Sequence, residues 1–202
     1  MTEFIHLFVK GWSPESRTLL LLHGTGGDEN DLLPLGKAID PGASLLSLRG
    51  RVLENGAPRF FRRLAEGVFD EEDVIKRSHE LAEFLQWAIQ KYAIDASELT
   101  VVGYSNGANI ASAMILLGIA PFSRGILLRA MVPLTNPVGT KKQSRRLLIL
   151  EGERDPIAPP AQGEELARRL RATGAEVELG FQPSGHELSA ADVEAAQAWL
   201  GT

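Results

Sequence analysis

The stretch Gly103-Tyr104-Ser105-Asn106-Gly107 separates two apolar segments of different character. Residues 99–102 (Leu-Thr-Val-Val) before it are typical of a buried strand, and the Ala-rich residues 108–117 after it are typical of a helix packed on a sheet. Glycine on both sides of the serine lets the chain reverse where a side chain would collide with its neighbours. We therefore expect a strand, a sharp turn and a helix, with the Ser105 hydroxyl exposed at the turn.

Strand-like and helix-like segments alternate along the rest of the chain. Short apolar runs that lead into a glycine are typical of parallel strands buried on both faces. They cover Thr18–Leu22, Ala43–Leu48, Gly125–Leu128 and Leu147–Leu150, with weaker strands at Glu3–Val9 and Glu176–Phe181. Amphipathic patterns predict helices over Asp73–Ile94, Gly163–Thr173 and Ser189–Leu200. This order predicts one α/β domain over residues 1–202, a mostly parallel central sheet flanked by helices, without a lid domain.

Charge and composition exclude several classes of partner and site. The 202 residues carry a formal net charge of -5, which disfavours nucleic acid or an anionic membrane as the main partner. The absence of cysteine excludes disulfides and a thiolate nucleophile. No apolar run approaches the roughly 18 residues of a membrane span, and the first residues lack a signal-peptide pattern. A cytoplasmic location is the default expectation.

A serine hydroxyl becomes a nucleophile only when a base takes its proton and a carboxylate orients that base. In hydrolases with a G-x-S-x-G turn, the order along the chain is Ser, then Asp or Glu, then His. His186 is the only histidine after Ser105, and Asp155 is the only aspartate between them. Each follows a predicted strand, where open α/β sheets place their sites. Several glutamates remain rival acids: Glu151, Glu153, Glu164, Glu165, Glu176 and Glu178.

Such a nucleophile also needs two backbone N–H groups aimed at the oxygen that becomes negative. We expect one from Asn106, directly after the serine. The other should come from the glycine-rich residues 23–28, where Thr25 is the preferred donor. His23, at the start of this loop, is expected to hold the loop in place.

Two long connections are candidates for the substrate pocket. Residues 49–72 hold five arginines, which could attract a substrate carboxylate or pair with Glu54, Glu66, Glu71 and Glu72. In the same segment, Phe60 and Phe61 could wall an acyl pocket or anchor the loop. Residues 131–146 contain Leu134, which we expect to line the same pocket.

Four motifs together resemble the phospholipase/carboxylesterase family of α/β-hydrolases. They are Leu22-His23-Gly24-Thr25-Gly26-Gly27-Asp28-Glu29, Gly103-Tyr104-Ser105-Asn106-Gly107-Ala108, Gly152-Glu153-Arg154-Asp155-Pro156 and Ser184-Gly185-His186-Glu187. The resemblance implies the roles given above for Ser105, Asp155, His186, Thr25 and Asn106. The acyl-protein thioesterase branch typically has Gln after the serine and Leu after His-Gly, so Asn106 and Thr25 look closer to small bacterial carboxylesterases. Small members of the family are often dimers, which leaves a homodimer as one expected state.

The sequence thus predicts a serine carboxylesterase for small or short-chain esters, with a small-molecule ester as its partner and no metal or cofactor required. Two alternatives stay open. The chain could bind a ligand without hydrolysing it, or it could be a thioesterase or lysophospholipase of the same family. A metal-dependent ring-opening enzyme would need a cluster of histidines and carboxylates that the sequence does not show.

Overall fold

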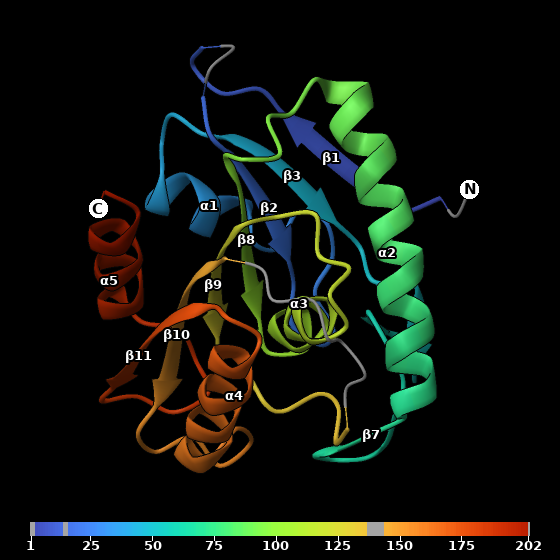
Figure 1. Ribbon diagram of the computed structural model, residues 1–202, viewed down its shortest axis with the longest axis vertical. Helices are drawn as coiled ribbons and strands as arrows, with labels where there is room; N and C mark the ends of the chain where they lie inside the picture. The colour runs from blue at the N-terminus through green and yellow to red at the C-terminus, as the bar shows by residue number, and fades with distance from the viewer. Residues whose placement is uncertain (1–2, 14–15, 137–143, 202) are drawn as a thin grey trace.

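The computed structural model describes residues 3–13, 16–136 and 144–201. Its centre is a seven-stranded sheet in which only the edge strand β1 is antiparallel to its neighbour (Figure 1). In spatial order the strands are β1 (His6–Val9), β3 (Ser44–Leu48), β2 (Thr18–Leu22), β8 (Leu99–Tyr104), β9 (Arg124–Leu128), β10 (Arg146–Gly152) and β11 (Glu176–Gln182). The expected mostly parallel α/β sheet is confirmed.

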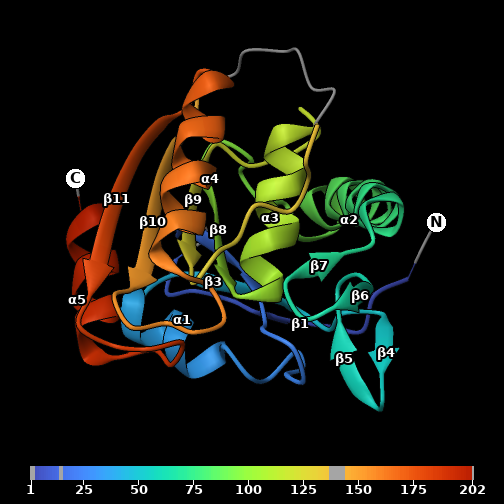
Figure 2. The same ribbon diagram turned by 90° about the horizontal axis from the view of Figure 1, so that it is seen from below.

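Helices cover both faces of this sheet (Figure 2). On one face lie α2 (Glu71–Tyr92), α3 (Asn106–Leu116) and α4 (Pro160–Ala172), and on the other α1 (Leu33–Ile39) and α5 (Ala190–Leu200). A hydrophobic core lies on each face of the sheet, and alternate side chains of the central strands pack into one core or the other. Leu20 and Leu22 pack into the core on the first face, and Leu19 and Leu21 into the core on the second. Every residue of β2 is buried, as a strand covered on both sides requires.

Two helices begin at residues whose side chains cap the free backbone N–H groups of the first turn. Asp70 accepts a hydrogen bond from the Asp73 N–H at the start of α2, and Ser189 and Asp192 form a reciprocal capping box at the start of α5. Within α2 the apolar residue Ile75 is 40% exposed, so it lies off the buried face of the helix. Helix α1 is not predicted by the sequence. Pro34 lies in its first turn and Gly36 in its interior, packed closely on Leu21, so its composition is that of a turn.

The segment 49–72 is more ordered than its composition suggested. It contains two hairpins, β4 (Val52–Glu54) with β5 (Ala57–Arg59), and β6 (Arg63–Ala65) with β7 (Val68–Phe69). Asn55 and Gly56 join the first pair with positive φ at both residues, the geometry that Asn-Gly favours in a two-residue turn. Figure 2 shows the β4–β5 hairpin projecting from the body of the molecule.

Across the described ranges, no helix is long and apolar enough to cross a membrane. The same residues bring together no group of three or more His, Asp or Glu side chains suited to hold a metal ion.

Candidate active site

Ser105 occupies a sharp turn between the end of β8 and the start of α3. Its backbone has φ 50° and ψ -110°, a conformation that non-glycine residues adopt only at a cost of about 1–3 kcal/mol. Both flanking glycines are required by close packing. A Cβ on Gly107 would lie 2.0 Å from the carbonyl oxygen of Leu22, and one on Gly103 would lie 2.7 Å from the backbone of Ala108. The turn therefore lifts the serine out of the sheet at the carboxyl end of the strand.

Three side chains from three different loops form a hydrogen-bonded row at this edge. The Nε2 atom of His186 lies 3.0 Å from Ser105 Oγ, and its Nδ1 atom lies 2.7 Å from Asp155 Oδ2. A carboxylate can only accept, so Nδ1 carries the proton and Nε2 is left to accept from the hydroxyl. The other oxygen of Asp155 accepts from the N–H groups of Ile157 and Ala158 at 2.8 and 2.9 Å. This arrangement can move a proton from the serine to the imidazole.

The loop that carries His186 is held by Arg129, a residue that sequence reasoning missed. Arg129 directly follows β9, has a positive φ of 54° and is fully buried. Its guanidinium pairs with both carboxylate oxygens of Asp192 at 2.8 and 2.9 Å. It also donates at 3.0 Å to four acceptors: Leu150 O, Ser184 Oγ, Gly185 O and Glu187 O. A charged residue directly after an apolar strand is the only signal of this role in the sequence.

The expected oxyanion donors lie on two adjacent segments. Asn106 is the first residue of α3, where backbone N–H groups have no acceptor within the helix. Thr25 lies on the loop after β2, and His23 fixes that loop. The buried ring of His23 bonds through Nδ1 to Gly24 O at 2.6 Å and accepts the Gly50 N–H through Nε2 at 2.9 Å. Burial lowers the pKa of His23, so the ring stays neutral and keeps both bonds.

No family model matches the chain. It is 43% identical over 194 residues to "Putative hydrolase MhqD" of Bacillus subtilis (strain 168), covering 96% of both chains. The chain belongs to the phospholipase/carboxylesterase family of α/β-hydrolases.

Solved structures of carboxylesterases agree with this membership. The Bacillus cereus carboxylesterase is 44% identical with a TM-score of 0.93, covering 98% of this chain and 93% of that one. The Mesorhizobium loti carboxylesterase is 31% identical with a TM-score of 0.93, covering 98% and 94%. A structure of YahD with malic acid is 29% identical with a TM-score of 0.92, covering 98% of each chain. The protein is thus an esterase-type hydrolase.

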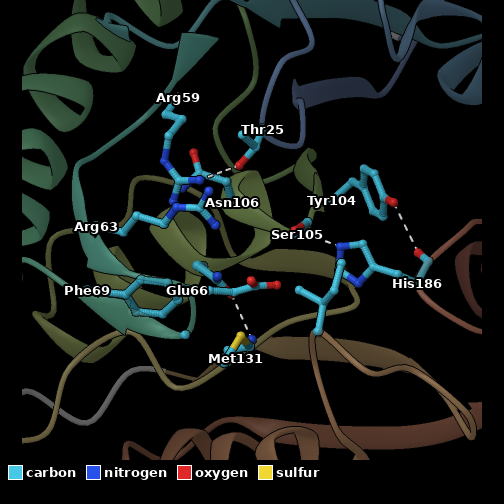
Figure 3. A pocket seen from close by; sticks show the side chains of 13 residues that line it. Thr25, Arg59, Arg63, Glu66, Phe69, Tyr104, Ser105, Asn106, Met131 and His186 are labelled. Carbon is cyan, nitrogen blue, oxygen red and sulfur yellow. Dashed lines mark hydrogen bonds between the residues drawn. The ribbon is translucent and has the colours of Figure 1, made fainter. Parts of the chain in front are cut away.

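In this esterase a cavity of about 220 Å³ opens beside Ser105. Figure 3 shows His186 and Tyr104 on one side of it and Arg59 and Arg63 on the other. Its apolar surface comes from Phe69, Met131 and Ile157, and its polar surface includes Thr25, Asn106 and Asn109. The volume is below the range of roughly 300–1,000 Å³ typical of sites for drug-sized ligands.

The predicted pocket residues Phe60, Phe61 and Leu134 do not line this cavity. All three are at most 2% exposed and belong to the core beneath α2 and α3. Phe60 packs on the ring of His23 with ring centres 4.9 Å apart, and its N–H donates to Asn106 Oδ1. Large apolar side chains gain more from full burial than from a small polar pocket, so Phe60 and Phe61 anchor segment 49–72 on the core, and Leu134 is a core residue as well.

A second buried acid lies under the esterase site. Glu151 ends the apolar part of β10 and is fully buried, with Oε1 accepting the Ala130 N–H at 2.9 Å. In the described part of the chain its Oε2 has no hydrogen-bond partner. Burial raises the pKa of this carboxyl to about 9, so Glu151 is neutral near pH 7. The acid that contacts His186 is Asp155, and Glu151 instead bonds to the backbone of Ala130.

Proposed function

We propose that the protein is a serine carboxylesterase that hydrolyses small carboxylic esters through an acyl-enzyme on Ser105. The observation that carries the proposal is the row of hydrogen bonds from Ser105 Oγ through His186 to Asp155, at 3.0 and 2.7 Å. It combines a nucleophile, a base and a group that orients the base, which are the elements of covalent acyl transfer. Membership of an esterase family supports the same chemistry.

The proposed reaction has two halves. Ser105 Oγ attacks the ester carbonyl while His186 Nε2 takes the hydroxyl proton, and Asp155 stabilises the imidazolium that forms. The N–H groups of Thr25 and Asn106 bind the oxyanion. The intermediate collapses, His186 gives its proton to the departing alcohol, and the acyl group stays on Ser105. Water then repeats the attack with His186 as base and releases the acid.

Small substrates are favoured by the size of the cavity. A cavity of about 220 Å³ with three large apolar side chains on its lining suits a short acyl group better than a long chain. YahD, a related structure, was solved with malic acid, which is itself a small carboxylic acid. The cytoplasmic location, the single-domain boundaries and the homodimer expected from the sequence stay predictions.

The test is turnover of p-nitrophenyl acetate and its thioester analogue by wild type and Ser105→Ala. Loss of the nucleophile should lower kcat by about 10⁴-fold or more, with an unchanged unfolding midpoint. Ser97→Ala is the matched control, because Ser97 lies before β8, at the end of the strand away from the turn. Turnover by Ser105→Ala close to the wild-type rate would refute the mechanism, and faster thioester cleavage would reassign the substrate.

A further inference from the structure

Two arginines face the nucleophile across the cavity. Arg59 ends β5 and Arg63 begins β6, so the two hairpins bring them to the same wall. Figure 3 shows both guanidinium groups on the side opposite His186. A wall with two fixed cations is unusual in a pocket that needs only to hold a neutral ester, because burying a charge is costly unless it gains a partner.

Arg59 is held rigidly and keeps free donors. Its side chain is only 3% exposed. The Nε atom donates to Phe61 O at 3.1 Å, and Nη1 donates to Thr25 Oγ1 at 2.5 Å. Within the described residues, Nη2 of Arg59 has no protein acceptor. A guanidinium whose edge is fixed this way presents N–H groups in a defined direction.

Among the described residues, a single carboxylate contacts these two arginines. Glu54 is shared, with one carboxylate oxygen 3.2 Å from Arg59 Nε and the other 2.8 Å from Arg63 Nε. Glu54 itself does not line the cavity. The carboxylate that does is that of Glu66, an exposed residue with no ion pair to either arginine among the described residues. Asn106 adds a further donor, because its Oδ1 is taken by the Phe60 N–H and its buried Nδ2 has no partner in the described part of the chain. Donors without acceptors therefore gather at one wall.

We propose that Arg59 and Arg63 form a carboxylate subsite, so that the preferred substrates are small esters that carry a free carboxylate. A carboxylate offers two coplanar oxygens, which match the parallel N–H groups of a guanidinium. This inference rests on the proposed esterase function and narrows its substrate class. The hydrolysis is unchanged: water is added across the ester bond, an acid and an alcohol leave, and the second carboxylate takes no part in bond making.

The carboxylate could belong to the acyl or to the alcohol portion of the ester, and two pairs of equal-shaped substrates separate these cases. Monoethyl succinate and ethyl 4-methylpentanoate differ only in a carboxylate or an isopropyl group on the acyl side. Acetoxyacetate and isobutyl acetate differ in the same way on the alcohol side. Titration of released acid at constant pH gives kcat/KM for all four esters without a chromophore.

In wild type, the charged ester of at least one pair should be preferred by about tenfold in kcat/KM, as expected for a charge-assisted hydrogen bond. Arg63→Gln should lower that ratio about tenfold. Arg62→Gln removes the same charge from the neighbouring residue, whose side chain is 62% exposed and bonded to Asp70, and should leave the ratio unchanged. Glu66→Gln removes the negative charge on the lining and should raise the ratio.

The outcomes separate the two claims. Equal rates for charged and neutral esters in both pairs overturn the subsite and leave the esterase mechanism standing. A preference that survives Arg63→Gln also overturns it. If no ester is hydrolysed, the proposed function fails and the subsite fails with it. Should Arg63→Gln not fold, raising the salt concentration on wild type must reduce the preference for the charged ester, and a salt-independent ratio refutes the proposal.

Discussion

Replacing Glu151 with Gln should make the protein more stable at neutral pH, although it alters a fully buried residue next to the active site. Oε1 of Glu151 accepts the Ala130 N–H, and the amide oxygen of Gln can accept it equally. The other end of the side chain lacks a partner in the described residues, so an amide NH₂ there replaces an equally unpaired carboxyl OH. The substitution therefore changes the ability to ionise and little else.

The size of the effect follows from proton binding. Burial raises the pKa of Glu151 to about 9 in the folded chain, against 4.5 for an ordinary glutamate. The folded state thus holds a proton that the unfolded chain releases above pH 4.5, and stability is lost as pH rises from there towards 9. At about 1.36 kcal/mol per pH unit, roughly 3 kcal/mol is lost by pH 7. The Gln variant is neutral in both states and avoids this loss.

Urea unfolding at pH 5, 6, 7 and 8 measures the effect. The advantage of Glu151→Gln over wild type in free energy of unfolding should grow steadily from pH 5 to 8, by about 4 kcal/mol in total, since about 1.36 kcal/mol is added per pH unit. Glu153→Gln is the matched control, because Glu153 lies two residues further along the chain, directly after β10, and is exposed. A difference between Glu151→Gln and wild type that stays constant from pH 5 to 8 would show that the buried carboxyl does not hold its proton.

Three further predictions concern the supports of the site. Gly107→Ala should cost about 3 kcal/mol or more in urea unfolding, because its Cβ meets the Leu22 carbonyl; a stable variant would refute the tight turn. Burial lowers the pKa of His23, so wild type should lose stability as pH falls below 6.5, and His23→Gln should lack that component. Arg129→Met should cost about 3 kcal/mol, since it leaves the Asp192 carboxylate buried, and should lower kcat more than it raises KM; unchanged kcat would contradict its positioning of His186.

Much of the fold could be predicted because buried parallel strands have a strong sequence signature. Residues 19–22 of β2 and residues 125–128 of β9 are apolar or small, and each run ends at a polar residue. Helix α1 could not be found this way, since Pro34 and Gly36 are poor helix formers and only packing against the sheet stabilises them. The Asn55-Gly56 turn did have a local signal, which was hidden inside a segment interpreted as one long loop.

In the candidate site, the proposed catalytic residues could be predicted from the sequence and the walls of the pocket could not. The G-x-S-x-G motif and the order along the chain pointed to Ser105, Asp155 and His186, with several glutamates left as rival acids. The structure brings these three residues within hydrogen-bond distance. The pocket walls could not be predicted, because residue type does not reveal whether an aromatic ring faces a cavity or the core. Phe60 was expected as a candidate wall and is buried, whereas Met131 lines the cavity and gave no signal.

The central claim is that Ser105 is an activated nucleophile. Labelling with a fluorophosphonate tests it most directly, because the reagent reacts with serines whose proton is removed by a base. Mass mapping of the labelled peptides should place a single adduct on Ser105, absent in Ser105→Ala and strongly slowed in His186→Ala. Labelling that persists in Ser105→Ala, or no labelling of the wild-type protein, would contradict the account.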